Sequence, residues 1–211
     1  MTLLHLIRHG TNDSLTQHRI AGRDWELHLN DEGHTQARRR AETMRGVPLA
    51  AILCSPLPRC QETAAPLAEL HGLPIETRDE LIELEFGGWT GRTHDEIRDD
   101  ERWRAFNSFR AGTAIPGGET LAEARARMLR IAIEVRERYP EGEVAIVGHG
   151  DPLRALVMQG LGMSDDSIHR LHLTLDPGQA SIQTCHKPLY NTPTCWTDHV
   201  LYPGPSTCPT G

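Results

Sequence analysis

The sequence predicts an α/β protein, a three-layer sandwich with a mostly parallel central sheet and helices on both faces. Short apolar runs of strand length alternate along the chain with longer segments of helical periodicity. A length of 211 residues suits one such domain better than two and is enough to bury a sizeable core. The content of 38% hydrophobic and 24% charged residues is that of an ordinary soluble globular domain, which agrees with this class.

The first half of the chain is expected to hold three strands and two helices. Strands are predicted at residues 3–7, 50–54 and 74–77. Asn30 is expected to cap a helix, because its side-chain oxygen can accept a first-turn backbone N–H group. The apolar face of that helix carries Ala37, Ala41 and Met44. Ser55 and Pro56 are expected to open the second helix, which runs to about residue 71.

The second half continues the alternation. Thr120 and Glu123 form a capping box in front of a long amphipathic helix. Its apolar positions are Leu121, Ala124, Met128, Ala132 and Val135. Strands are predicted at residues 143–147, 171–175 and 180–185. Asp151 and Pro152 are expected to cap the helix that follows the first of these strands and ends near residue 162.

Charge and hydropathy exclude several classes of partner. The net charge of −7 argues against a general binder of nucleic acid or of a membrane surface. An anionic substrate therefore needs a local positive pocket. The opening run TLLHLI is too short for a signal-peptide core, and no apolar stretch reaches the length of a membrane span. We expect a cytoplasmic protein, and the sequence is compatible with a homodimer.

The cysteines fit that compartment. There are five, an odd number without a CxxC pair, which is typical of reduced thiols. A disulfide between Cys195 and Cys208 is the alternative. Both lie in the proline-containing residues 187–211, which we interpret as an irregular extension of a main domain spanning residues 1–186. No histidine spacing indicates a metal site, and no cofactor is expected.

Four stretches that contain arginine, histidine or glutamate stand out from the expected core. They are LIRHG at 6–10, SPLPR at 55–59, ELEFGGWTG at 83–91 and VGHG at 147–150. Three of them follow predicted strands, and ligands of open parallel sheets bind beyond the carboxyl ends of the strands. We therefore expect these stretches to converge in space although they are far apart in sequence.

The residues in these stretches suit phosphoryl transfer. Arg8 and Arg59 can each hold a phosphate with forked hydrogen bonds. His9 and His149 lie beside glycines, which let the backbone approach a ligand closely. His149 also precedes an expected helix start, where backbone amides favour an anion. Glu83 supplies a carboxyl group that can move a proton, so a nucleophile, positive charge and an acid are all present.

The same stretches resemble the motifs of the histidine phosphatase superfamily, the phosphoglycerate mutase-like group. RHG at 8–10, SPLPRCQETA at 55–64, ELEFGGWTG at 83–91 and GHG at 148–150 match its order and spacing across residues 3–161. The resemblance implies an α/β sandwich with the site at the strand ends. It implies that His9 becomes phosphorylated and that Glu83 protonates the leaving group. It further implies that Arg8, Arg59 and His149 hold the phosphate.

The chain departs from the family pattern beside these positions. Thr11 and Asn12 follow the RHG triplet, where many members carry Glu and then Ser or Thr. Leu15 stands where such members carry an asparagine, and Asn12 is a candidate for the missing phosphate contact. Glu85 is the alternative proton donor, because it lies two residues from Glu83 in the same motif.

The function implied is a metal-independent phosphatase acting on a small phosphorylated metabolite. His9 attacks phosphorus while Glu83 protonates the leaving oxygen, and Glu83 then activates a water that attacks the phosphohistidine. One alternative is a phosphoglycerate mutase-type phosphotransferase, whose members usually carry adjacent arginines after the acid motif; residues 91–118 hold no such pair. A second alternative is a non-catalytic phospholigand-binding module. The segment with Trp103, Arg104, Phe106 and Arg110 either contacts substrate or forms a surface helix.

Overall fold

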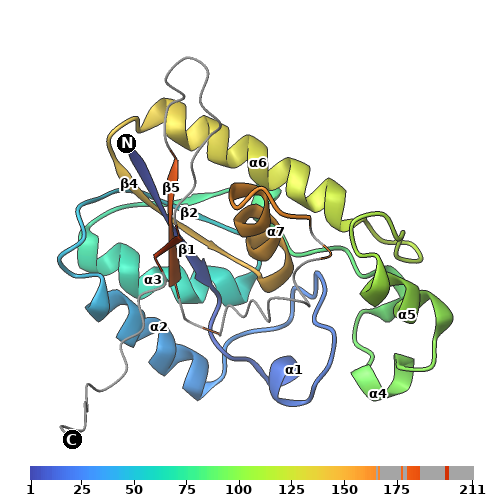
Figure 1. Cartoon of the computed structure of the whole chain (residues 1–211). Coiled ribbons are helices and arrows are strands. Elements are labelled where there is room, and N and C mark those ends of the chain that lie inside the picture. Colours follow the sequence, from blue (N-terminus) through green and yellow to red (C-terminus); the bar gives the residue numbers. More distant parts are fainter. Residues whose placement is uncertain (165, 167–176, 178–179, 186–197, 200–211) are drawn as a thin grey trace, which may run out of the picture.

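The computed structural model of the chain describes residues 1–164, 166, 177, 180–185 and 198–199. Its centre is a six-stranded sheet of order β3-β2-β4-β1-β5-β6 (Figure 1). The strands are β1 (Thr2–Arg8), β2 (Leu49–Cys54), β3 (Ile75–Thr77), β4 (Glu143–Gly148), β5 (Ala180–Cys185) and β6 (Asp198–His199). The first four run parallel, whereas β5 is antiparallel to β1 and β6 is antiparallel to β5. The mostly parallel α/β sheet predicted from sequence is confirmed.

Seven α-helices lie in the described residues. They are α1 (Asp13–Thr16), α2 (Asp31–Thr43), α3 (Pro58–His71), α4 (His94–Ile97), α5 (Glu101–Ser108), α6 (Leu121–Arg138) and α7 (Gly150–Gly160). Two short 3₁₀ helices, Asp79–Leu81 and Gly87–Trp89, lie in the connections between β3 and α4. None of the described helices is long and apolar enough to cross a membrane.

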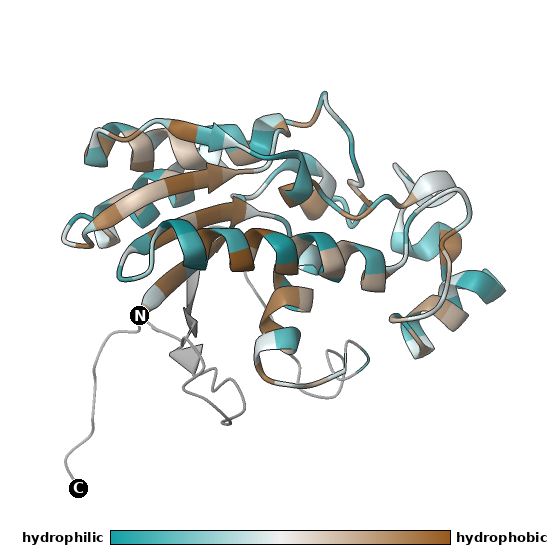
Figure 2. Ribbon diagram, turned by 90° about the horizontal axis from the view of Figure 1, so that it is seen from above, coloured by the Kyte–Doolittle hydropathy of each residue, from teal (hydrophilic) through white to brown (hydrophobic). Residues whose placement is uncertain are grey.

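Alternate residues of the central strands face two apolar layers, as a pleated sheet requires. One face, which includes Leu6 and Ile146, packs against α6 and α7. The other face, which includes Ile7 and Val147, packs against α2 and α3. Seen along the sheet, the strands are enclosed between the two helical layers (Figure 2). The three-layer sandwich expected from the sequence is therefore confirmed.

Two of the predicted helix starts are confirmed and two are wrong. Asn30 accepts the Gly33 N–H group at 3.0 Å and caps α2. The capping box of Thr120 and Glu123 forms at the start of α6. By contrast, α3 begins only at Pro58, because the chain bends at Pro56 and Leu57 after β2 has ended, and Leu57 is the N-cap without a side-chain bond. Helix α7 begins before Asp151, with His149 as its N-cap.

The short helices α4 and α5 form a separate lobe beyond the carboxyl ends of the parallel strands (Figure 1). A third apolar cluster joins this lobe to the body, with Trp89, Phe106 and Ile97 at its centre and Ala155 of α7 at its base. Because the lobe stands over the strand ends, it closes one side of the space where the four motifs meet. The alternative prediction for this segment, a surface helix, holds only for the outer face of the lobe, where Arg104 lies.

The predicted strand at residues 171–175 and the Cys195–Cys208 disulfide lie outside the described residues. Residues 198–199 form β6 within the segment interpreted as irregular. The division at residue 186 stays a prediction.

Candidate active site

The register of three neighbouring strands brings three motif residues together. Arg8 of β1 pairs with Gly148 of β4, and Cys54 of β2 pairs with Val147 of β4. His9, Ser55 and His149 follow directly, so their side chains leave the same edge of the sheet. The rings of His9 and His149 meet edge to face, with centroids 5.2 Å apart. The convergence expected from parallel topology is thus present.

The loop after β1 fixes the protonation of His9. Nδ1 lies 2.8 Å from the Gly10 carbonyl oxygen, and since a carbonyl can only accept, Nδ1 carries the proton and Nε2 keeps its lone pair. Gly10 is needed here, because a Cβ at this position would lie 2.6 Å from the Gly33 oxygen. Burial, together with the charges of Arg59 and Arg8, lowers the pKa of His9 well below its ordinary value. His9 is therefore a neutral, buried imidazole with an available nitrogen.

Arg59 is fully buried on α3, and the chain holds its guanidinium from one side. Its Nη1 donates to the Asp24 carbonyl at 3.0 Å and its Nη2 to the Gly22 carbonyl at 2.7 Å. Its Nε has no hydrogen-bond partner among the described residues. A buried donor of this kind is costly unless something accepts from it. The Arg59 group is therefore rigidly placed, keeps a full positive charge and has an N–H to offer an anion.

His149 is the second buried imidazole of the site. Its Nε2 lies 2.7 Å from Ser55 Oγ, and its Nδ1 lies 3.9 Å from Glu83 Oε2. Burial, followed by the charges of Arg59 and of a protonated His9, lowers the pKa of His149 well below its ordinary value. We therefore expect His149 to act as a neutral hydrogen-bonding group and not as a source of positive charge.

Glu83 is a buried carboxyl group beside His149, with Oε2 3.9 Å from Nδ1 of that ring. Burial raises its pKa to about 7, with a further contribution from the negative charge of Asp151, against the Leu84 N–H group and the charges of Arg59 and Arg8. The alternative acid, Glu85, instead accepts from the Gly87 N–H group and lies 3.7 Å from Arg23. Of these two carboxyl groups, only Glu83 lines the cavity of the site.

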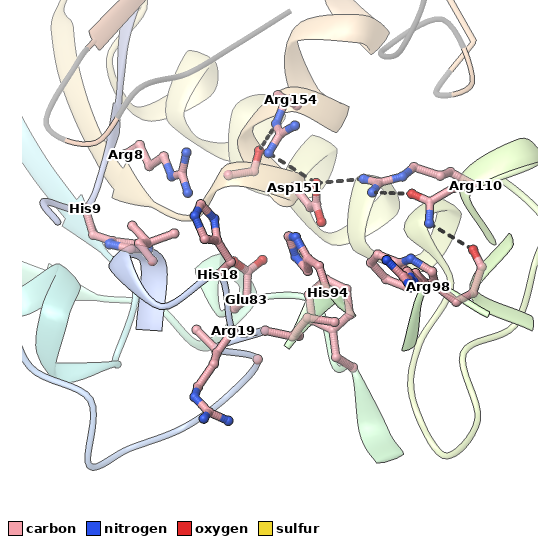
Figure 3. Close-up of a pocket in the computed structure, with 18 of the residues that line it drawn as sticks. Arg8, His9, His18, Arg19, Glu83, His94, Arg98, Arg110, Asp151 and Arg154 are labelled. Atoms are coloured by element: carbon pink, nitrogen blue, oxygen red, sulfur yellow. Dashed lines mark hydrogen bonds and ion pairs between the residues drawn. The ribbon is translucent and has the colours of Figure 1, made fainter. Parts of the chain in front are cut away.

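A cavity of about 620 Å³ opens from this site. Figure 3 shows Arg8 and His9 toward one end of it and Arg98 and Arg110 toward the other, with Asp151 between them. Further lining residues are Leu15, His18, Arg19, Ile20, Ala21, Gly22, Phe86, His94, Asp95, Trp103, Asn107, Gly150 and Arg154. The lobe of α4 and α5 thus supplies one wall, and of the two alternatives left open for this segment, contact with the cavity holds for Trp103 of α5 and for Arg110 just after it. Phe106 is instead buried in the apolar cluster beneath.

Asp151 holds two arginines of this cavity. Arg110 Nη1 donates to its Oδ1 at 2.9 Å, and Arg154 Nη2 lies 3.4 Å from the same oxygen. Burial alone would raise the pKa of Asp151, but the two arginines outweigh it and lower the pKa below its ordinary value. Gly150 gives the arginines room, since a Cβ there would lie 2.9 Å from Arg154 and 3.4 Å from Arg8.

Asn12 lies at the edge of this arrangement. Its Oδ1 accepts the Leu15 N–H group at 2.9 Å and caps α1. Its Nδ2 is buried and has no hydrogen-bond partner in the described part of the chain. Asn12, like Arg59 and His149, lies behind the residues that line the cavity. Its capping bond gives it a local role, and its Nδ2 is a donor without a partner among the described residues.

Sequence reasoning missed Ser55 as a site residue, and it missed Arg154, His18 and His94 as lining residues. The strand register gives the signal for Ser55, because a residue one past β2 faces a residue past β4. Arg154 lies one helical turn after Gly150, on the face that points back to the motif. The two histidines come from loops and a short helix without periodicity. The described residues hold no group of three side chains suited to a metal ion.

Comparisons with known proteins agree with this geometry. Residues 4–188 match the model of the histidine phosphatase superfamily (branch 1). A probable phosphoglycerate mutase GpmB of an Enterobacter species is 33% identical over 177 residues, which cover 82% of this chain and 81% of that protein. Phosphoserine phosphatase 1 of Hydrogenobacter thermophilus is 30% identical over 165 residues, 77% of this chain and 78% of that protein.

The structure of a mycobacterial glucosyl-3-phosphoglycerate phosphatase complexed with VO3 superposes with a TM-score of 0.83. It is 27% identical, and the match covers 94% of this chain and 98% of that one. The chain spans about half the length of several curated mycobacterial relatives that it matches at 33% identity, 48% of each. With the family model covering most of its length, the chain belongs to the histidine phosphatase superfamily.

Proposed function

We propose that the chain is a phosphatase that hydrolyses a small phosphomonoester by way of a phosphohistidine on His9. The observation that carries the proposal is the state of His9. Its Nδ1 is tied to the Gly10 carbonyl at 2.8 Å, so the lone pair of Nε2 is available in a buried site beside two arginines. A neutral imidazole in such surroundings suits nucleophilic attack on phosphorus.

The phosphoryl group is held by Arg8, Arg59 and His149. The role of Arg59 is supported by its Nε, which has no other partner among the described residues. His149 contributes as a neutral hydrogen-bond donor, because its pKa is well below the ordinary value. Positive charge placed in advance around the equatorial oxygens stabilises the transition state of phosphoryl transfer. Asn12 adds a fourth contact through its buried Nδ2, which has no hydrogen-bond partner among the described residues.

Glu83 moves the proton in both steps. As His9 Nε2 bonds to phosphorus, the bond from phosphorus to the leaving oxygen breaks and Glu83 gives that oxygen its proton. In the second step a water oxygen bonds to phosphorus, the phosphorus–nitrogen bond breaks, and Glu83 takes the proton of the water. A pKa of about 7 supports both roles, because both forms of Glu83 are then present at neutral pH.

The substrate is a small molecule whose leaving group occupies the outer cavity. The volume of about 620 Å³ exceeds what a phosphate needs and suits a metabolite-sized group. Five arginines outnumber the three carboxyl groups in the wall, and Phe86, Trp103 and Ile20 supply apolar surface. This local positive charge offsets the net charge of −7 for an anionic substrate.

The reaction needs no metal ion, since Arg8 and Arg59 already supply the positive charge that a cation would provide. The protein works in the cytoplasm, in agreement with two buried free thiols at Cys54 and Cys60. The oligomeric state, for which a homodimer is the candidate, can be measured by sedimentation.

A phosphoglycerate mutase is the second candidate, and the similarity to a probable mutase favours it. Both candidates form a phosphohistidine, but a mutase returns the phosphoryl group to a bound intermediate instead of to water. One experiment separates them from each other and from a binding module. The purified protein is given a panel of metabolite phosphates, 3-phosphoglycerate included, and products are followed by ³¹P NMR. Inorganic phosphate supports the phosphatase, an isomeric phosphoglycerate supports the mutase, and unchanged substrates support binding alone.

A further inference from the structure

Ser55 faces His149 across the ends of two paired strands. Its backbone N–H group continues the sheet by donating to the Val147 carbonyl at 2.9 Å. Its hydroxyl then lies 2.7 Å from Nε2 of His149, and both side chains are 0% exposed. The hydroxyl does not cap α3, which begins three residues later. A buried hydroxyl this close to an imidazole nitrogen shares a proton with it, so the direction of this bond matters.

The surroundings decide the direction. The Leu57 N–H group points at Ser55 Oγ at 3.4 Å, so the oxygen already has a weak donor and its own proton needs an acceptor. The thiol of Cys60 lies 3.4 Å from Nε2 of His149 and 3.5 Å from the Gly148 carbonyl oxygen. A thiol is a weak donor with a single proton, and the hydroxyl of Ser55 is closer to Nε2, at 2.7 Å, so Ser55 is the stronger partner of that nitrogen. Burial keeps His149 neutral, so one of its two nitrogens must accept. The Ser55 hydroxyl therefore donates its proton to the lone pair on Nε2 of His149.

We infer that Ser55 is a positioning residue that donates to Nε2 of His149 and thereby keeps the imidazole proton on Nδ1. Nδ1 is the nitrogen on the side of Glu83, 3.9 Å from its carboxyl oxygen. His149 then presents an N–H group to the site, whereas His9 presents a lone pair from Nε2. The two histidines thus present opposite groups to the site, each fixed by one hydrogen bond on the side away from the reaction.

The inference rests on the proposed function only for its kinetic consequence. With the proton on Nε2, Nδ1 would direct a lone pair at the phosphoryl oxygens, and two acceptors repel. The loss therefore falls on binding of the phosphoryl group and not on protonation of the leaving oxygen. Ser55→Ala is expected to weaken vanadate binding about tenfold, the size of one neutral hydrogen bond in a buried site. Phosphorylation of His9 should slow about as much for good and poor leaving groups.

The experiment uses the whole chain labelled with ¹⁵N at its 12 histidines. Long-range ¹H–¹⁵N spectra separate protonated from unprotonated ring nitrogens, and the spectrum of His149→Gln assigns the signals. The control is Thr2→Val, which removes a buried hydroxyl bond of 2.8 Å to the Tyr139 carbonyl at the far end of β1. Vanadate affinity and single-turnover phosphorylation are measured on the same three proteins, wild type, Ser55→Ala and Thr2→Val.

The wild type should show His149 with Nδ1–H and an unprotonated Nε2, and Ser55→Ala should show the Nε2–H tautomer or a mixture. Thr2→Val should keep the wild-type tautomer and the wild-type vanadate affinity. A wild-type spectrum with the proton on Nε2, or an unchanged tautomer in Ser55→Ala, overturns the inference. If the tautomer is as stated but no phosphomonoester is turned over, the proposed function fails and the assignment of Ser55 to His149 stands.

Discussion

Asp151→Asn tests the electrostatic link between the outer cavity and the proton donor. The carboxylate of Asp151 raises the pKa of Glu83, although burial is the larger cause. The substitution removes that negative charge and also leaves Arg110 and Arg154 without their shared carboxylate partner. Both effects favour the ionised form of Glu83, so its pKa should fall. Glu83 has to be protonated to serve as the acid, and activity is therefore lost as the pH rises through its pKa.

The size of the shift follows from the starting value. Glu83 lies at about 7, against an ordinary value of 4.5. Since burial accounts for the larger share, Asp151 is assigned about one pKa unit. At pH 7 the protonated fraction of Glu83 then falls from about one half to about one tenth. Phosphorylation of His9 by an alkyl phosphate should slow about fivefold at that pH and recover as the pH is lowered.

The assay is single-turnover phosphorylation of His9 by an alkyl phosphate between pH 5 and pH 9, a range spanning about two units either side of the pKa. The basic limb of the profile should move down by about one pH unit in Asp151→Asn. Asp31→Asn is the matched control, because it removes the same charge from the exposed first turn of α2, where solvent and salt screen it. A basic limb that stays in place in Asp151→Asn, or moves upward, refutes the electrostatic reasoning.

Three further outcomes are expected. Glu83→Gln should slow phosphorylation of His9 by about a hundredfold or more with an alkyl phosphate but far less with p-nitrophenyl phosphate, which leaves without a proton; equal slowing in single-turnover assays would point to Glu85. Prolonged treatment with a chelator should leave the rate of hydrolysis unchanged, and activity restored by one divalent cation would contradict metal independence. Ile146→Ala, at a fully buried position in the central strand β4, should lower the free energy of unfolding by about 2–5 kcal/mol in urea titrations, and a loss below about 1 kcal/mol would contradict the tight packing of that layer.

Much of the fold is predictable because its signals are local. Buried parallel strands are continuous apolar runs, and the capping box at Thr120 is readable from four residues. The errors at Ser55 and Asp151 have one cause. Both have side chains typical of caps, but each has a tertiary partner instead: His149 for Ser55 just after β2, and Arg110 for Asp151 in the first turn of α7. At these two positions the contacts of the site, and not the capping propensity of the residue, decide what the side chain does.

Only part of the candidate site could likewise be predicted from the sequence. Its inner part follows from motifs at the ends of adjacent parallel strands, so the meeting of His9 and His149 could be expected from the sequence alone. The outer part could not, because α4 and α5 are too short for periodicity and their place depends on the apolar cluster around Trp89. The neutral state of His149 has no signal in the sequence either, since burial and neighbouring charges set it.

The central claim is that His9 forms a covalent bond to phosphorus during turnover. The direct measurement is to mix the protein briefly with a phosphomonoester carrying labelled phosphate, quench the mixture and locate the label in the chain. We expect label on His9 that is lost in acid and retained in base, as a phosphoramidate bond requires, and no label in His9→Ala. Label in His9→Ala at the wild-type level, or label that is stable in acid, would contradict the account.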